Sequence, residues 1–566
     1  MASFFSNRKT DIIVYFARMN RKKFIQSVGL LAASTPVNNA LQAANIGDIH
    51  DDLKEQSKTK FLNKNQVFHS DDEKKEPMDT LWAADEIRWK KIQKNYPKTP
   101  GIINLENGYF SHQSWSTLNK HLDFEFDINV ETSRFMRTQQ QTEIEKARVS
   151  FAQFLQIPTE QLAFTRNTTE SLNTVIMGFP WQAGDEVIIG DQDYGSMVEA
   201  FEQVSARFGV IIKKAAVPQQ WQIQLTQNSL QEYEESISAA YTGLISDKTK
   251  MVHVTDLINL TGQVVPTARI ATHVKEINPN IMVVADAAHS LAHTLGPFNY
   301  SFSHLLSAGV DAVGGSLHKW LCNPIGVGFL IVKPNWIEKI WPLMGDTGIA
   351  KNNIRKFEHQ GTRPIQSLQT ISTAINQHET IGSESKLTRL QYLKLTWMGI
   401  KQGPVERALF GEVKLPAKWE KLHNQIIDLS TLTNNEGKNK IRIFGQPVII
   451  LNESAYGNSL MLQNTKAAVD KSGNESITSI LKNSNLGIKM LPTLPQNLYY
   501  YQGAIATVSV EGYSPAQLAK KLLDDFGIYT VAIDHPRVKG VRVTPHLSSS
   551  FEDCFRLNQA LAKLAK

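Results

Sequence analysis

The chain has 566 residues, of which 42% are apolar and 20% are charged, with a formal net charge of +6 at pH 7. This is the composition of a globular protein long enough for two or more cores, and the small charge without a basic, aromatic-rich stripe argues against a nucleic-acid partner. The two cysteines, Cys322 and Cys554, are too few for a disulfide framework or a metal cluster, so no metal site is expected. Two unpaired core thiols are favoured, although a single bridge is compatible with the sequence.

Residues 1–44 have the pattern of an export segment. From Met19 the sequence is MNRKKFIQSVGLLAASTPVNNALQAAN, in which a basic stretch precedes a short apolar run and then small residues. The apolar run is too short for an ordinary transmembrane helix, so no stable membrane span is expected. The alternative is a disordered or amphipathic tail.

The basic core at residues 21–24, RKKF, resembles a twin-arginine export signal with lysine in place of the second arginine. This resemblance implies a start at Met19, cleavage near Ala43 or Ala44, and the bacterial periplasm as the destination, with the cytoplasm as the alternative. Residues 45–78 are polar and charge-rich, and are predicted to form a linker.

Helices and strands alternate from about residue 80 onward. The predicted strands cover 102–111, 162–165, 186–190, 210–217, 250–255, 281–286 and 311–315. The predicted helices cover 80–95, 142–156, 168–179, 197–209 and 270–278, with a long helix within 370–405. Nearly continuous aliphatic strands that alternate with helices indicate an α/β fold, with a mostly parallel sheet flanked by helices.

The same pattern predicts the domain organisation. Residues 121–385 are expected to form the large domain, and residues 386–566 a smaller α+β domain. Residues 79–120 are expected to form an N-terminal segment that packs on the small domain. The stretch 405–500 shows no pattern from which elements can be assigned.

Two ionisable residues follow strands of the predicted sheet. Asp286 ends the strand IMVVAD, and Lys319 follows the strand DAVGG. Ligand sites of parallel sheets lie at the carboxyl ends of the strands. An amine and a carboxylate there suit pyridoxal phosphate, whose aldehyde bonds a lysine and whose ring nitrogen is kept protonated by an acid. An Asp–Lys ion pair at the sheet edge is the structural alternative.

A phosphate site is predicted where the strand ending at Thr165 gives way to a helix. Thr168 and Thr169 place hydroxyls and free backbone N–H groups at the helix N-terminus, which suits an anion. Ordinary N-capping accounts for the same residues. Ser316 and His318, which lie close to Lys319 in the sequence, could supply further hydrogen-bond donors to the phosphate.

Six motifs together resemble a known family: FTRNTTESLN, DQDYGSM, HVTDLINLTGQVVP, VVADAAHS, GGSLHKWL and FEHQGTRP. In this order they are similar to those of class V aminotransferase-type enzymes, which have the pyridoxal-phosphate-dependent transferase fold type I. Within that group the chain is most similar to the isopenicillin N epimerase-like branch. The resemblance covers about residues 100–385 and, further on, GVRVTPH near residue 542.

The resemblance implies a role for each matching residue. Lys319 matches the Schiff-base lysine, Asp286 the partner of the pyridine nitrogen, and His289 a side chain near the phenolic oxygen. Asn259 would approach the same oxygen. A motif that often carries a stacking histidine has Tyr194 here, which is expected to stack on the cofactor ring. Buried packing is the alternative role for His289 and Tyr194.

The remaining matches concern the phosphate and the substrate. Thr168 and Thr169, with Ser316 and His318, match the phosphate site. Gly361 and Thr362 match a segment that reaches the phosphate from the neighbouring subunit, which implies a homodimer with shared active sites. Arg542 matches the arginine that binds a substrate carboxylate, and Asn107 and Gly108 match a loop near the substrate.

These matches imply an enzyme that acts on the amino group and Cα of an amino acid, by transamination or epimerisation. A lyase acting at Cβ and an exported, non-catalytic binding protein are the alternatives. Cysteine desulfurase chemistry is disfavoured because residues 527–541, which precede Arg542, contain no cysteine. A nucleotide-binding protein lacks support because neither GxGxxG nor GxxxxGK[ST] opens a helix.

Overall fold

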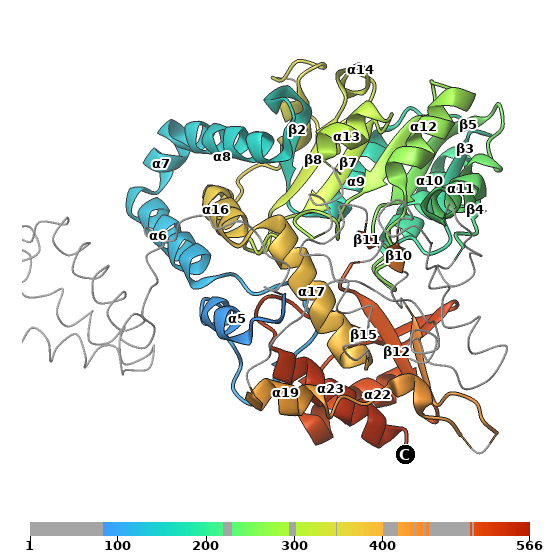
Figure 1. The fold of residues 1–566 in the computed structure, drawn as a ribbon. Coiled ribbons are helices and arrows are strands. Elements are labelled where there is room, and N and C mark those ends of the chain that lie inside the picture. The colour runs from blue at the N-terminus through green and yellow to red at the C-terminus, as the bar shows by residue number, and fades with distance from the viewer. Residues whose placement is uncertain are drawn as a thin grey trace, which may run out of the picture. The chain divides into compact units, whose positions relative to one another are not determined.

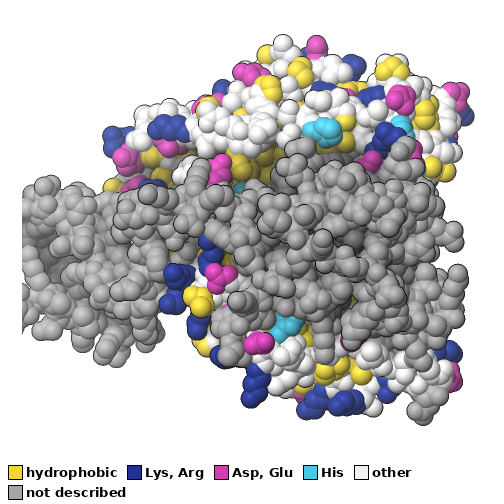
Figure 2. Space-filling view, viewed as in Figure 1, with side chains coloured by type: hydrophobic (Ala, Val, Ile, Leu, Met, Phe, Trp, Pro, Cys, Tyr) yellow, Lys and Arg dark blue, Asp and Glu magenta, His cyan; other side chains and the backbone are white. Residues whose placement is uncertain are grey.

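The computed structural model describes residues 83–218, 229–293, 301–346, 348–399, 417–434, 436–444, 449–451, 498–500 and 503–566. The predicted export segment 1–44, the predicted linker 45–78 and most of 405–500 lie outside the described residues. Within the described residues, no helix is both long and apolar enough to cross a bilayer. Figure 2 shows basic and acidic side chains interspersed over the described part of the face that it draws.

A seven-stranded sheet forms the centre of the larger α/β part of the chain (Figure 1). Its strands are β2 (Leu162–Thr165), β3 (Glu186–Gly190), β4 (Ile211–Ala215), β5 (Thr249–Thr255), β6 (Met282–Asp286), β7 (Ala312–Ser316) and β8 (Gly328–Val332). Their order is β2-β8-β7-β6-β5-β3-β4. Only the pairings of β8 with β2 and β7 are antiparallel, so the predicted, mostly parallel sheet is confirmed.

Helices cover both faces of this sheet. One face packs against α9 (Thr168–Gly178), α10 (Gly195–Phe208) and α14 (Pro334–Ile337). The other packs against α8 (Gln140–Leu155), α11 (Ser229–Thr242), α12 (Thr267–Ile277), α13 (Phe302–Ser307) and α16 (Ile371–Ile381). Within β6, Val283 and Ala285 enter one core and Met282 and Val284 the other, as the alternation of a strand requires.

A second, antiparallel sheet has the order β14-β15-β12-β9. These strands are β9 (Ile441–Phe444), β12 (Ala506–Val510), β14 (Val531–His535) and β15 (Val538–Val543). Helices α17 (Ser383–Met398), α22 (Pro515–Phe526) and α23 (Phe551–Leu564) contribute to the same core. Ala83, Ala84 and Leu105 also enter this core, and β1 (Ile103–Asn104) pairs in parallel with β13 (Ile528–Tyr529).

The structure also contains α5 (Glu86–Gln93), α6 (Trp115–Glu131), α7 (Ser133–Thr138), the 3-10 helices η3 (Thr159–Gln161), η5 (Ile354–Glu358) and η6 (Leu429–Thr431), α15 (Gln366–Gln369) and α19 (Ala417–His423). Strands β10 (Ile449–Leu451) and β11 (Leu498–Tyr500) form a separate two-stranded sheet.

Several predicted elements differ from the observed ones. The helix predicted over 80–95 begins only at Glu86, because the Asp85 side chain accepts hydrogen bonds from the Ile87 and Arg88 N–H groups and caps it there. Of the strand predicted over 102–111, only β1 is formed. The long helix predicted within 370–405 is divided at Gly382, whose φ of 84° ends α16 before α17 begins.

Candidate active site

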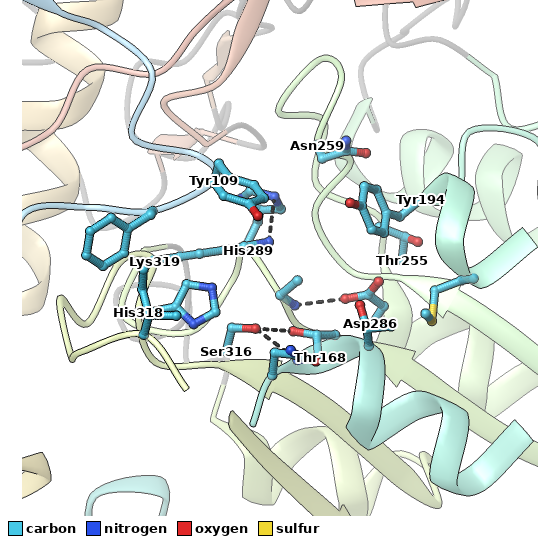
Figure 3. A pocket seen from close by; sticks show the side chains of 16 residues that line it. Tyr109, Thr168, Tyr194, Thr255, Asn259, Asp286, His289, Ser316, His318 and Lys319 are labelled. Atoms are coloured by element: carbon cyan, nitrogen blue, oxygen red, sulfur yellow. Dashed lines mark hydrogen bonds between the residues drawn. The ribbon is translucent and has the colours of Figure 1, made fainter. Parts of the chain in front are cut away.

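A cavity of about 240 Å³ lies where β6 and β7 end and α9 begins (Figure 3). Nine of the predicted site residues line it: Thr168, Thr169, Tyr194, Asn259, Asp286, His289, Ser316, His318 and Lys319. Sheet topology explains their meeting, because the carboxyl ends of neighbouring parallel strands lie at one edge of the sheet. Five other predicted residues, Asn107, Gly108, Gly361, Thr362 and Arg542, do not belong to the lining.

Lys319 and His289 are in direct contact. Lys319 Nζ lies 3.2 Å from His289 Nε2, and Trp320 Nε1 donates to His289 Nδ1 at 3.3 Å. Burial, reinforced by the nearby Lys319 ammonium, lowers the pKa of His289 well below its ordinary value. The imidazole is therefore neutral, and because Nδ1 accepts from Trp320, the ring proton is on Nε2 and points to the lysine amine.

The amine of Lys319 loses its proton more readily than that of an ordinary lysine. Burial lowers the pKa of Lys319 to about 8, against the opposing effect of the Asp286 carboxylate. A neutral amine can accept the Nε2–H of His289, and it is also the form that acts as nucleophile or base. The contact between the two side chains therefore stabilises the reactive form of the lysine.

Asp286 lies across the cavity from Lys319 (Figure 3). It is the last residue of β6, and its Oδ1 accepts the Ala288 N–H at 2.9 Å. Burial raises the pKa of Asp286, and His253 is the strongest of the groups that oppose this rise. His253 Nδ1 lies 2.7 Å from Asp193 Oδ2, and although burial lowers the pKa of His253, Asp193 and Asp286 together outweigh burial and raise it. His253 thus favours the ionised form of Asp286.

The N-terminus of α9 forms the floor of the cavity. Asn167 caps this helix by accepting the Glu170 N–H at 2.9 Å, and Ser316 at the end of β7 holds its first turn. Ser316 Oγ lies 2.9 Å from the Thr168 N and 2.6 Å from the Thr168 Oγ1. Two hydroxyls thus meet at a helix N-terminus, where the helix dipole favours an anion.

Gly328→Ala is expected to weaken cofactor binding by about tenfold, equivalent to about 1.4 kcal/mol. A Cβ on Gly328 would lie 2.6 Å from Asn167 N and Cα, so the cap of α9 would have to shift. Titration of the cofactor-free protein with pyridoxal phosphate measures the change. Gly345→Ala is the control, because no atom lies within 4 Å of its added Cβ. Equal affinities for the two variants would contradict the role of this contact.

Two buried polar atoms in the lining have no hydrogen-bond partner among the described residues. They are Asn259 Oδ1 and His318 Nδ1. Burial lowers the pKa of His318 to about 4, so this ring is neutral. Because buried polar atoms in proteins are nearly always paired, both atoms are available to a ligand of the cavity.

Two tyrosines lie on opposite sides of the opening. Figure 3 shows Tyr194 on the side of Asp286 and Tyr109 on the side of Lys319. Their exposed fractions, 44% and 74%, leave both rings accessible from solvent. Tyr194 precedes α10 at the position predicted to stack on a cofactor ring.

The predicted substrate residues lie beside the cavity. Asn107 and Gly108 both donate backbone N–H groups to Thr544 Oγ1, at 2.7 and 3.0 Å, and Asn107 Nδ2 donates to the Thr544 carbonyl. They anchor the loop, and the next residues, Tyr109 and Phe110, reach the cavity instead.

Arg542 forms a buried ion pair with Glu106, a residue for which no role was predicted. Gly361 and Thr362 are exposed, and Gly361 borders a separate cavity of about 410 Å³ that Arg355 and His359 also line. In a single chain this segment does not reach the Lys319 cavity.

The lining residues that were not predicted are Tyr109, Phe110, Met197, Thr255, Ala288 and Ile325. Thr255 ends β5 next to Asp286, so the rule that places ligands at strand ends could have found it. His253 and Asp193 fall within two of the six motifs, HVTDLINLTGQVVP and DQDYGSM, but no role was predicted for either residue.

The stability of the cofactor-free protein is expected to rise with pH relative to a Lys319→Met variant. The pKa of Lys319 is about 8 in the folded chain and 10.5 ordinarily, so between these values the unfolded chain binds a proton that the folded chain lacks. The difference in free energy of unfolding should change by up to about 1.4 kcal/mol per pH unit in that window. Urea unfolding at several pH values measures it, and a constant difference would contradict a buried, depressed lysine.

The sequence profile of the class-V aminotransferase family matches residues 119–400. Isopenicillin N epimerase of Streptomyces clavuligerus is 24% identical over 293 residues, which are 49% of this chain and 69% of the relative. A probable cysteine desulfurase of Synechocystis is 25% identical over 333 residues, covering 55% of this chain and 72% of the relative.

Solved structures share the fold. The cysteine desulfurase CsdA of Escherichia coli superposes with a TM-score of 0.55 at 16% identity, over 84% of this chain and 98% of that one. A cystine C-S lyase in complex with cysteine persulfide gives a TM-score of 0.56 at 17% identity, over 82% and 98%. At 16–17% identity, the similarity to these structures shows a shared fold alone.

The fold and the cavity together define a fold type I enzyme that depends on pyridoxal phosphate. Within that class, the chain belongs to the class-V aminotransferase family and is similar to its isopenicillin N epimerases, as the sequence motifs predicted. The lining fits the cofactor: Thr168, Thr169 and Ser316 would hold the phosphate, Asp286 the ring nitrogen and Lys319 the aldehyde carbon. The unpaired Asn259 Oδ1 and His318 Nδ1 are further groups left for it.

Proposed function

We propose that this enzyme acts on the amino group and Cα of an amino acid, in an epimerase-like or transaminase-like reaction. The observation that carries the proposal is the presence of one amine with a lowered pKa, Lys319, in the same cavity as the Asp286 carboxylate and the N-terminus of α9. Both reactions require a base that removes the proton from the carbon bearing the amine, and epimerisation also requires a proton to be returned to that carbon. Lys319 has the chemistry of such a base.

When bound, pyridoxal phosphate supplies a ring that withdraws electrons from that carbon. The protein supplies the remaining functions. Asp286 provides a fixed negative charge for the ring nitrogen, supported by His253 below it. His289 orients the Lys319 amine through Nε2, 3.2 Å away, and its neutral ring does not compete with the lysine for a proton. Tyr109 and Phe110 also line the cavity.

A lyase acting at Cβ is the second candidate, because hercynylcysteine sulfoxide lyase of Schizosaccharomyces pombe is 20% identical over 54% of this chain. Cysteine desulfurase chemistry is less well supported, although such enzymes are among the relatives. Both cysteines are free and buried, and burial raises the pKa of Cys322 to about 11 and that of Cys554 well above its ordinary value. A thiol in that state is a poor nucleophile.

Absorbance spectroscopy of the purified protein tests the proposal. We expect a visible band from bound cofactor that borohydride bleaches, leaving the coenzyme mass on the Lys319 peptide. The common L- and D-amino acids are then screened for changes in this band. Inversion at Cα with deuterium uptake from heavy water and no keto acid indicates epimerisation, a keto acid that keeps the side chain indicates transamination, and loss of a β-substituent with release of ammonia indicates the lyase. A colourless protein that pyridoxal phosphate does not alter would support a binding protein instead.

We propose further that two copies share their active sites. The exposed Gly361–Thr362 segment matches the family segment that reaches the neighbouring phosphate, and within one chain it lies outside the Lys319 cavity. Mixing a Lys319→Ala chain with a Thr362→Trp chain should restore activity in part, because one site of the mixed dimer carries neither change. A monomer in analytical ultracentrifugation would contradict this proposal.

Export to the bacterial periplasm is proposed from the sequence pattern of residues 19–45, which lie outside the described residues. In a cell with a twin-arginine route, the expected result is a periplasmic protein whose N-terminus lies beyond about residue 40 (after the candidate sites Ala43 and Ala44). Arg21→Lys, which removes the remaining arginine of the motif, should retain the protein in the cytosol. Full-length cytosolic protein for both forms would contradict export.

A further inference from the structure

Glu106 and Arg542 form a buried ion pair beside the cavity. Glu106 Oε1 lies 2.5 Å from Arg542 Nη2, and Oε2 lies 3.2 Å from Nε. The two side chains are only 5% and 10% exposed. Arg542 Nη1 also donates to the carbonyl of Asn259, at 3.4 Å, and Asn259 lines the cavity. The pair therefore lies directly behind the cavity wall.

Glu106 occupies one edge of the guanidinium. It uses the edge formed by Nε and Nη2, while Nη1 and Nη2 carry further N–H groups beyond those that these contacts use. A guanidinium can bind a second carboxylate through such an edge in a bidentate manner. The ion pair thus fixes the orientation of Arg542 without using up all of its donors.

The same carboxylate holds the loop that borders the cavity. Glu106 Oε1 accepts the backbone N–H of Tyr109 at 3.1 Å. Gly108 packs against the arginine, since a Cβ there would lie 3.4 Å from Arg542 Cζ and 3.1 Å from Thr544 Cγ2. One side chain therefore sets both the direction of the arginine and the place of Tyr109.

We infer that Glu106 is a positioning residue for substrate recognition: it holds Arg542 by the Nε–Nη2 edge so that the remaining N–H groups bind the α-carboxylate of the substrate. This inference rests on the proposed function, in which the substrate is an amino acid, and adds Glu106 as the residue that orients the arginine for its carboxylate. Without Glu106 the arginine would be free to turn, and the selection of acids over neutral analogues would weaken. A purely structural ion pair would affect stability without affecting that selection.

The test compares α-amino acids with their primary amides as ligands of the holoenzyme. Apparent dissociation constants are taken from the visible band of the bound cofactor, for the common L- and D-amino acids and the matching amides. The wild type should prefer the acids, and Glu106→Gln should reduce this preference by at least about tenfold, mainly through weaker binding of the acids. Glu106→Asp should restore part of it, because it keeps the charge.

Glu86→Gln is the matched control, because Glu86 forms an ion pair with Arg389 that is even more buried and lies away from the cavity lining. It should lower the thermal stability and leave the preference unchanged. A preference for acids in Glu106→Gln equal to that of the wild type would overturn the inference. If Glu106→Gln does not fold, Glu106→Asp replaces it: wild-type preference and wild-type affinity for acids in that variant would overturn the inference. If the wild type binds amides as tightly as acids, the inference is overturned but the proposed function is not. A wild type whose band responds to no amine removes the proposed function as well.

Discussion

Lys319→Ala is expected to lower turnover by at least roughly 10³-fold. No other lysine of the described residues lines the cavity, so the variant leaves the site without an amine for the cofactor or for proton transfer. It should also leave no coenzyme mass on the protein after borohydride treatment. Steady-state kinetics with the amino acid found in the screen and mass spectrometry of the reduced protein measure the two effects.

A second buried lysine provides the control for this variant. Lys386 donates to the Trp320 carbonyl, and burial lowers its pKa to about 8, as for Lys319, yet it lies outside the lining. Lys386→Met should reduce stability and still fix the coenzyme on Lys319. If Lys319→Ala held the cofactor as tightly and turned over as fast as the wild type, the assignment of this cavity would be wrong.

Asp286→Asn is expected to lower turnover by roughly 10²–10³-fold while the coenzyme stays attached to Lys319. The substitution keeps the size of the side chain and removes its charge. The cofactor ring would then lose the anion that favours its protonated nitrogen, and His253 would face only Asp193. Asp286→Glu should retain part of the rate. The rate constants and the position of the visible band are the measurements.

Asp256→Asn is the control for this charge effect. Asp256 follows β5, accepts the Thr267 hydroxyl at 2.7 Å and has a pKa raised to about 6 by burial, but it lies outside the lining. An asparagine can accept the same hydroxyl, so turnover should change little. If Asp256→Asn lost as much turnover as Asp286→Asn, the effect would not be specific to the carboxylate in the cavity.

The fold could be predicted where burial leaves a clear pattern. β2 and β3 have the predicted bounds because every one of their residues is buried, which requires an unbroken apolar run with polar residues at its ends. Helix α6 was not predicted, since Thr117 is its one fully buried residue and no apolar stripe repeats along it. Helix α11 was missed as well.

The site could be predicted as far as strand ends determine it. Asp286 and Ser316 end neighbouring strands, and Lys319 follows three residues later, so the sheet alone brings them together. The Glu106–Arg542 pair joins residues 436 positions apart, and no local pattern indicates it. The loop at Asn107 shows the same limit: its place near the site was predicted, but which of its side chains face the cavity depends on the bonds to Thr544.

The antiparallel part of the molecule is assembled from distant segments, because residues 83–105 share a core with residues 506–565 and Ile103 pairs with Ile528. During synthesis on the ribosome, the early segment must wait until nearly the whole chain has emerged. The seven-stranded sheet is complete by Val332 and can form first. Nascent chains arrested before residue 528 should therefore expose Leu105 and Ile103 to proteases and to chaperones that bind apolar segments.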